Sequence, residues 1–172
     1  MNNNDRLLRL RYAIDIKDTD LVKAFDLGGI TVTKEEVREM LTRVKDTEQE
    51  EDNVYLKAIN NQVFDSFLNG FIILKRGPKN NKAPEETPLK SKEIRNINNI
   101  LIKKLKIALF LTSEDMLAIF AEAGVYPSKG ELGAILRKEG HRNFKPCGDK
   151  YMRNFLKGLG LCYRNEANKD NR

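Results

Sequence analysis

The residue types that most readily bind metals or attack substrates are scarce in this chain. It contains one histidine, His141, and two cysteines, Cys147 and Cys162. Structural zinc sites are built from closely spaced pairs of such residues, for example Cys-x-x-Cys, and the sequence has no such pair. We therefore expect no bound metal and no cofactor. The two thiols are expected to be free in a reducing compartment, because two cysteines do not make a disulfide framework.

Two glutamates occupy a repeated position and could act as paired carboxylates in acid–base catalysis. However, Glu36 follows Thr33 by three residues, and Glu131 follows Ser128 in the same way. This spacing is typical of a capping box, in which a hydroxyl and a carboxylate bond the first N–H groups of a helix. The sequence also lacks a phosphate-binding loop, a dinucleotide-binding glycine pattern and a serine nucleophile elbow. The interpretation is that the protein is not an enzyme and has no catalytic residue.

Positive charge is concentrated in the second half of the chain. Residues 98–172 contain 14 Lys and Arg against 8 Asp and Glu (+6), whereas residues 1–77 contain 12 against 14 (−2). The candidate nucleic-acid-binding residues in the basic half are Lys138, Arg142, Lys145, Lys150, Arg153 and Lys157. Such cations attract phosphates, and neighbouring rings can stack on bases. The rings among them, Phe144 and Tyr151, fall at positions that are apolar in the first half, so core packing and a merely solvated surface are the alternatives.

The elements that would position these residues come from a tandem duplication. At an offset of 95 residues the matching pairs are Leu10/Leu105, Ala13/Ala108, Asp20/Asp115, Phe25/Phe120, Gly29/Gly124, Lys34/Lys129, Glu36/Glu131 and Leu41/Leu136. At an offset of 88 they are Lys57/Lys145, Phe67/Phe155, Leu68/Leu156, Gly70/Gly158 and Arg76/Arg164. The change of offset means that the first copy has seven extra residues, most simply the acidic run Asp46–Asp52.

Apolar residues recur at helical spacing in both copies, and each copy is predicted to contain about four helices. In the first copy these helices begin near Asp5, at the N-cap Asp18, at the capping box of Thr33 and near Asn61. In the second copy the first helix contains Leu101, Leu105, Ala108 and Leu109, and the others begin at the N-cap Ser113, at the capping box of Ser128 and near Asp149. No segment alternates polar and apolar residues with period two, so no strand is expected.

We therefore predict an all-α protein of two homologous helical repeats related by a pseudo-twofold axis. Residues 1–77 form the first repeat, and residues 98–172 form the second repeat with a disordered C-terminal tail. Residues 78–97 form the linker, since this segment contains three prolines and few apolar residues. A core of about 70 residues gives a margin of only roughly 3–5 kcal/mol, which favours packing of the repeats against each other.

The first helix of each repeat has a second apolar stripe opposite its expected core face. The stripe residues are Leu8, Tyr12 and Ile16 in the first repeat, and Ile100, Ile107 and Leu111 in the second. A helix that is apolar on two faces is normally buried on both. The hypothesis is that the two first helices pack against each other about the pseudo-twofold axis. Two alternatives remain: Ile16 and Leu111 lie beyond the helix end and cover the next turn, or the surface joins two chains in a homodimer.

Short motifs spread over residues 3–164 complete the pattern. In the first copy they are Asn3-Asn4-Asp5, Leu10-Arg11-Tyr12-Ala13 and Phe67-Leu68-Asn69-Gly70. In the second copy they are Asn98-Asn99-Ile100, Lys103–Ala108, Asn143–Asp149 and Phe155–Leu159. With these motifs the chain resembles the YehS-like family of uncharacterised bacterial proteins, which is defined by two tandem copies of a domain of unknown function. The resemblance implies the duplication and a cytoplasmic bacterial setting, and it implies no activity or ligand.

The sequence predicts function only as a class. A content of 40% hydrophobic and 33% charged residues is that of a soluble globular protein. No apolar run reaches the roughly 18 residues of a membrane span, and residues 1–15 lack the layout of a signal peptide. We expect a cytoplasmic, non-enzymatic helical interaction module, monomeric or homodimeric, with an unknown protein partner. Nucleic-acid binding through the basic second repeat is the first alternative, and a small-molecule enzyme or sensor is the second.

Overall fold

The fold is all-α, as the sequence predicts. The computed structural model describes residues 1–44, 53–77 and 94–170, with side chains placed up to residue 166. In this part of the chain there are eight helices: α1 (Asn3–Ile14), α2 (Asp18–Leu27), α3 (Lys34–Leu41), α4 (Asn61–Arg76), α5 (Ile97–Ala108), α6 (Ser113–Glu122), α7 (Lys129–Leu136) and α8 (Asp149–Asp170). The same residues contain no strand, and Arg43 and Tyr55 form an isolated antiparallel bridge. None of the helices described is long and apolar enough to cross a membrane.

The helices form two repeats, α1–α4 and α5–α8, that place equivalent residues in equivalent positions. Phe25 of α2 packs on Phe67 of α4 with ring centroids 4.8 Å apart, and the equivalent pair, Phe120 and Phe155, lies 5.2 Å apart. The buried apolar side chains of both repeats form one continuous core. The predicted two-repeat helical fold is therefore confirmed.

A repeated glycine allows the second and fourth helices of each repeat to approach closely. A Cβ atom added to Gly70 would lie 1.7 Å from the carbonyl oxygen of Ala24, and one added to Gly158 would lie 1.9 Å from that of Ile119. Any side chain there would force the two helices apart. The recurrence of these glycines at an offset of 88 is thus explained by helix packing.

The helix starts follow the predicted local chemistry at two of four sites. Both capping boxes are confirmed, with Thr33 Oγ1 and Ser128 Oγ each 3.1 Å from the N–H that it accepts. The predicted N-caps Asp18 and Ser113 are wrong, because each is the first helical residue. In the second repeat the cap is Thr112, one residue earlier, which is the position from which a hydroxyl reaches the third N–H of the helix.

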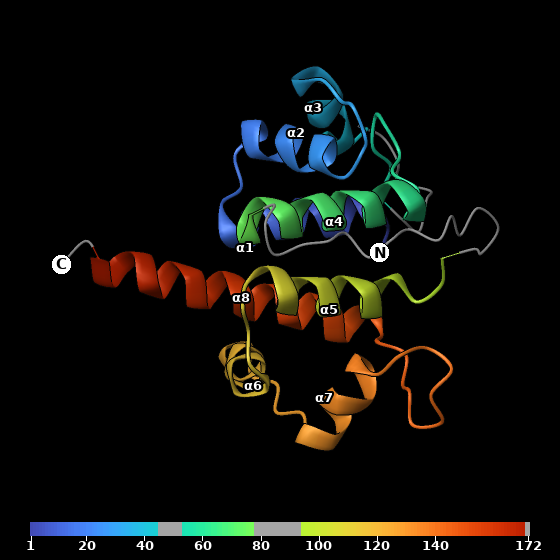
Figure 1. The fold of residues 1–172 in the computed structure, drawn as a ribbon. Coiled ribbons are helices and arrows are strands. Elements are labelled where there is room, and N and C mark those ends of the chain that lie inside the picture. Colours follow the sequence, from blue (N-terminus) through green and yellow to red (C-terminus); the bar gives the residue numbers. More distant parts are fainter. Residues whose placement is uncertain (45–52, 78–93, 171–172) are drawn as a thin grey trace.

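The two repeats are fused through two helix pairs, α1 with α8 and α4 with α5. Figure 1 shows α1, α4, α5 and α8 in the middle of the molecule, with α2 and α3 on one side and α6 and α7 on the other. The hypothesis that the two first helices pack mainly on each other is therefore wrong. The long fourth helices fill the space between the repeats, so each first helix packs on the fourth helix of the other repeat.

Three predictions concern the acidic run, the linker and the C-terminal tail. The acidic run Asp46–Asp52 and most of the 78–97 linker lie outside the described residues. The prediction of a disordered C-terminal tail needs correction, because α8 continues to Asp170. No glycine or proline follows Gly160 to break that helix.

Candidate functional site

One buried asparagine near the start of each repeat fixes the connection between the third and fourth helices. Asn4 forms three hydrogen bonds of 2.7–3.1 Å with the backbone of residues 40, 57 and 59. Asn99 forms the same three bonds, at 2.8–3.0 Å, with residues 135, 145 and 147. Both side chains are buried, and all three bonds are internal. These asparagines therefore shape the repeats and offer no group to a ligand.

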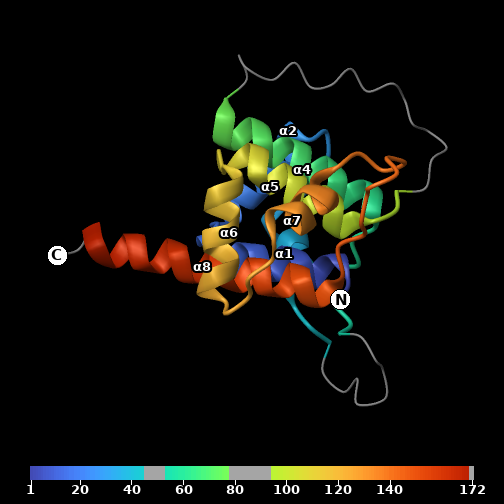
Figure 2. The same cartoon turned by 90° about the horizontal axis from the view of Figure 1, so that it is seen from below.

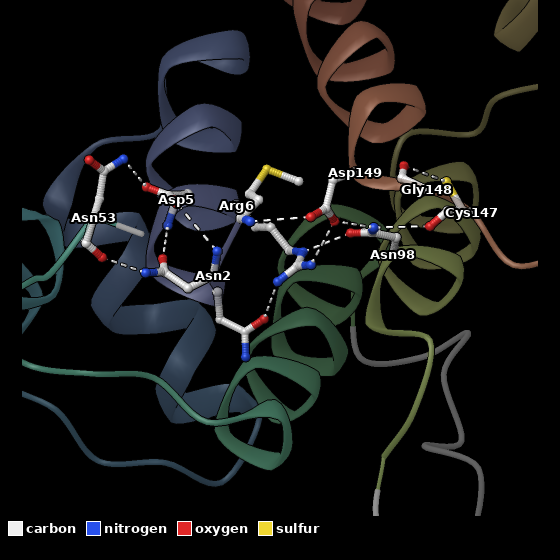
Figure 3. A network of polar contacts seen from close by, with 10 residues as sticks. Asn2, Asp5, Arg6, Asn53, Asn98, Cys147, Gly148 and Asp149 are labelled. Atoms are coloured by element: carbon white, nitrogen blue, oxygen red, sulfur yellow. Dashed lines mark hydrogen bonds and ion pairs between the residues drawn. The ribbon is translucent and has the colours of Figure 1, made fainter. Parts of the chain in front are cut away.

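A second polar cluster lies where the two repeats meet, with Arg6 at its centre (Figure 3). Its Nε donates to Oδ1 of Asn98 (2.7 Å), its Nη1 to Oδ1 of Asn3 (2.9 Å), and its Nη2 to Oδ1 of Asp149 (3.3 Å). Asn3 and Asn98 are repeat equivalents, so the guanidinium group bridges two symmetry-related side chains. Arg6 breaks the symmetry, because Leu101 occupies its position in the second repeat.

The charges of this cluster are balanced within the protein. Burial lowers the pKa of Arg6, and the carboxylate of Asp149 acts in the opposite direction. Burial alone would raise the pKa of Asp149, but the hydrogen bond from Asn98 and nearby positive charges outweigh it, and the pKa lies below its ordinary value. Because each guanidinium nitrogen of Arg6 donates to a protein oxygen and the side chain is buried, the cluster serves to join the repeats.

An open groove runs between α1 and α8, the helices that Figure 2 shows side by side. Its volume is about 560 Å³. Its floor is apolar and comes from both helices: Leu8, Ala13, Leu156 and Leu161. Four cations line it, namely Arg9 of α1, Arg43 of the segment after α3, and Lys157 and Arg164 of α8. The arrangement is suited to an anionic ligand.

The single carboxylate in the lining, that of Asp5, is already engaged. Its Oδ1 accepts from the hydroxyl of Tyr55 (2.6 Å) and from Asn53 Nδ2 (3.1 Å). Burial would raise the pKa of Asp5, but these hydrogen bonds outweigh it and the pKa lies below its ordinary value. Tyr55 also accepts a hydrogen bond from Arg43 Nε (3.4 Å), which holds Arg43 at the groove. Of the described residues between α3 and α4, Arg43 thus lines the groove.

The four cations are accessible and do not pair with acids in the described structure. All four side chains are exposed. None of the ion pairs formed among described residues involves Arg9, Arg43, Lys157 or Arg164. Among the described residues, the groove therefore presents positive charge that no ion pair neutralises.

An exposed tyrosine lines the groove. Tyr12 is 72% exposed, and the guanidinium carbon of Arg164 lies 4.7 Å from its ring centroid. A second hollow of about 460 Å³ continues past it and is lined by Leu8, Arg11, Tyr12, Asp15, Tyr163 and Arg164. The ring therefore lies between two adjoining recesses.

The two helix contacts between the repeats are the α1–α8 seam, which contains the groove, and the equivalent α4–α5 seam. In the α4–α5 seam, side chains of opposite charge pair with each other. There, Lys104 Nζ bonds both Asp65 and Asn69 across the two repeats. At the offsets of 95 and 88, the corresponding positions of the α1–α8 seam are Arg9, Arg153 and Lys157. An ion pair and a polar contact in one seam are thus replaced by three cations in the other.

The residues of the predicted basic surface are exposed, but they lie on two different segments of the chain. Lys138, Arg142 and Lys145 follow α7, whereas Lys150, Arg153 and Lys157 lie on α8, and only Lys157 lines the groove. The ring of Tyr151 packs on Phe120 with centroids 4.5 Å apart. That ring therefore belongs to the core side of α8 and gives the basic surface no stacking platform.

The residues of the predicted apolar stripe also separate. Leu8 and Tyr12 line the groove, while Ile107 is 44% exposed and lies on α5, where the Arg76 side chain donates to its carbonyl oxygen. Ile16 and Leu111 follow the ends of α1 and α5, as the first alternative predicted. The last member, Ile100, is half-buried on α5. Tyr12 and Ile107 are thus at the rims of the two seams and not buried between the repeats.

The remaining reactive residue types lie away from the groove. Burial raises the pKa of the Cys147 thiol to about 12, so this thiol is protonated and unreactive. His141 is exposed in the connection between α7 and α8. Within the described ranges, no three His, Cys, Asp or Glu residues are grouped to hold a metal ion.

Comparison with known proteins is consistent with this two-repeat organisation. Residues 3–77 and 98–165 each match the family model described as Protein of unknown function (DUF1456). The chain is 38% identical, over 159 residues, to the Uncharacterized protein YehS of Escherichia coli (strain K12), an alignment that covers 92% of this chain and 94% of that protein. No solved structure gives a significant match.

Proposed function

We propose that this chain, which belongs to the DUF1456 family of unknown function, is a non-enzymatic binding module. Its α1–α8 groove binds an anionic partner. The groove joins the two repeats, so the partner would contact both. The remainder of the molecule serves to hold α1 and α8 in parallel contact.

The observation that supports this proposal is the difference in charge between the two seams. Lys104 is neutralised by Asp65 in the α4–α5 seam, whereas its equivalent Arg9 lines the groove together with Lys157, and Arg153 takes the sequence position of Asp65. Like charges at close range destabilise a fold unless solvent or a counter-ion screens them. A bound anion would supply the negative charge that Asp65 supplies in the other seam.

The chemistry of the lining supports binding over catalysis. Acid–base and nucleophilic catalysis need a titratable or nucleophilic group poised at the ligand. In the lining, the carboxylate of Asp5 already accepts hydrogen bonds from Tyr55 and Asn53, and the other polar residues are arginines, one lysine and one tyrosine. Arginine side chains position and neutralise anions without changing them. Activation of the lysine or the tyrosine would need a neighbouring general base, and Asp5, the one carboxylate among the described lining residues, is already engaged.

The proposal is tested by charge reversal with a matched control. The double variant Arg9→Glu/Lys157→Glu changes the groove, while Lys138→Glu/Arg142→Glu makes the same change of net charge on the exposed segment after α7. Fluorescence anisotropy with a labelled heparin oligosaccharide at low salt measures affinity for a generic polyanion. Two surface ion pairs of about 0.7 kcal/mol each predict a loss of roughly tenfold in the groove variant. The control is expected to lose less than about twofold, and circular dichroism checks that both variants remain folded.

An equal loss in the two variants would show that the response follows net charge alone, and the groove would have no special role. A larger loss in the control variant would instead move the site to Lys138 and Arg142. That result would favour the alternative predicted from the sequence, in which the basic surface of the second repeat is the binding site.

A further inference from the structure

We infer that the anion bound by the groove is a single strand of nucleic acid; this inference rests on the function proposed above and names its partner class. The alternative occupant with the same charge is an acidic amphipathic helix, which docks by laying an apolar face into an apolar groove. The two occupants need different accessible groups, and the exposure of the lining residues distinguishes them.

The apolar floor is largely covered by the protein itself. Ala13 and Leu156 are 4% and 2% exposed, and Leu8 and Leu161 are half-buried. Ala13 and Leu156 therefore offer almost no surface to a docking helix, and the apolar surface that stays accessible includes the half-buried Leu8 and Leu161 and the ring of Tyr12. The exposed groups of the lining are the four cations and the ring of Tyr12. Cations that follow a groove, together with an exposed ring, are the combination that binds phosphates and stacks bases.

The position of Tyr12 fits a base better than it fits a carboxylate. Its ring lies between two adjoining recesses, and Arg164 covers part of the ring at 4.7 Å. An arginine stacked on a tyrosine fixes the ring and leaves the rest of its surface for a base. Tyr163, which is 43% exposed, lines the second recess and offers a further ring along the same path.

The cations of α8 are spaced to follow a strand. Lys157 and Arg164, the two α8 cations that line the groove, are seven residues apart, so they lie on one face of the helix. Seven residues span about 10 Å at 1.5 Å per residue. A stacked strand has one phosphate per about 3.4 Å, so this face matches roughly three nucleotides. Arginine predominates in the lining, and its planar guanidinium group suits phosphate oxygens.

A single strand is favoured over a duplex because the ring must reach the face of a base. In a duplex, the base faces are stacked on each other, and only their edges are open to a protein. RNA and DNA strands share the phosphate and base chemistry on which this inference depends, so both are included in the test.

The test uses the full chain and fluorescein-labelled 12-nucleotide strands, one of uridine and one of deoxythymidine, with a 12-base-pair duplex and a polyglutamate peptide as comparisons. Fluorescence anisotropy measures each affinity as a function of salt. Tyr12→Ala is expected to weaken single-strand binding by about tenfold, as for one stacked base, and Tyr12→Phe restores it because the ring is kept. Tyr126→Ala is the matched control, since Tyr126 is an 81% exposed tyrosine outside the groove, and it should bind as the unmodified protein does.

Salt provides a second readout. Removing the Lys157 charge by Lys157→Ala should reduce the slope of log affinity against log salt by about 0.7, the value for one phosphate contact of a single strand. A structural effect of the substitution would lower the affinity without changing this slope.

Three results would overturn the inference. The first is equal affinity for duplex and single strand, and the second is unchanged single-strand binding by Tyr12→Ala. The third is binding of heparin and polyglutamate with no binding of either strand, in which case the anion-binding groove stands and only its partner class is wrong. If the unmodified protein binds none of these anions, the groove proposal itself is rejected.

Discussion

Replacement of Arg6 by leucine tests whether the polar cluster between the repeats stabilises the fold. Leucine is the residue at the equivalent position of the second repeat, Leu101, so the substitution keeps an apolar stem and removes the guanidinium donors. The loss leaves Oδ1 of Asn3 and Oδ1 of Asn98 without their donor, and both side chains are buried. Asp149 is less affected, because its side chain is 41% exposed and Asn98 Nδ2 still donates to it at 2.8 Å.

The expected magnitude follows from these two orphaned oxygens. Each buried, unsatisfied acceptor costs about 1–3 kcal/mol, so the free energy of unfolding should fall by about 4 kcal/mol. For 172 residues, an unfolding entropy of about 2.1 cal/mol/K per residue gives roughly 0.36 kcal/mol/K. The predicted decrease in the melting temperature is therefore roughly 11 °C. Urea denaturation followed by circular dichroism measures the free energy, and a thermal scan measures the temperature.

Arg9→Leu is the matched control, because it makes the same substitution on the same helix at an exposed side chain that forms no ion pair among the described residues. Surface substitutions of this kind usually change the free energy of unfolding by about 0.5 kcal/mol or less. If Arg6→Leu destabilises the protein no more than Arg9→Leu does, the cluster is not what stabilises the contact between the repeats.

Two further predictions concern local stability. Thr33→Ala and Ser128→Ala should each lower the free energy of unfolding by about 0.5–2 kcal/mol, because each removes the hydroxyl of a capping box; unchanged urea midpoints in both would contradict this. The pKa of Asp5 lies below its ordinary value of 3.8, since its hydrogen bonds from Tyr55 and Asn53 outweigh burial. Its contribution is therefore present above that pH and is lost as the pH falls through the lower folded-state pKa. Asp5→Asn should reduce the loss of stability between about pH 5 and about pH 2, measured from urea midpoints at each pH; an unaltered acid dependence would count against this assignment.

The parts of the fold that were predictable from the sequence depend on interactions between near neighbours. The capping boxes of Thr33 and Ser128 involve residues three apart, so their hydrogen bonds can be predicted from the sequence spacing alone. The pairing of α1 with α8 was not predictable in this way. An apolar stripe shows that a helix face is buried, but it does not show which of several apolar helices covers it.

The groove was missed because charge was counted over halves of the chain. Arg9 and Arg43 belong to the first repeat, whose net charge is negative, and they meet Lys157 and Arg164 only when the repeats fold together. A usable signal was present in the duplication. Arg9 and its equivalent Lys104 are both basic, so comparing them gives no signal. Asp65, however, corresponds to Arg153, and this reversal of charge distinguishes the α1–α8 seam from the α4–α5 seam.

The two seams explain how a duplicated domain could keep its repeats joined and still carry the proposed binding surface. Each seam contains an ion pair between the repeats, but at a different position along the helices. In the α4–α5 seam it is Lys104 with Asp65, more than one turn into each helix. In the α1–α8 seam it is Arg6 with Asp149, in the first turn of both helices. Because that pair and its asparagines already join α1 to α8, the middle of the seam is not needed for pairing. Arg9 and its neighbours on α8 can then remain cationic, which a seam held together at its middle would not allow.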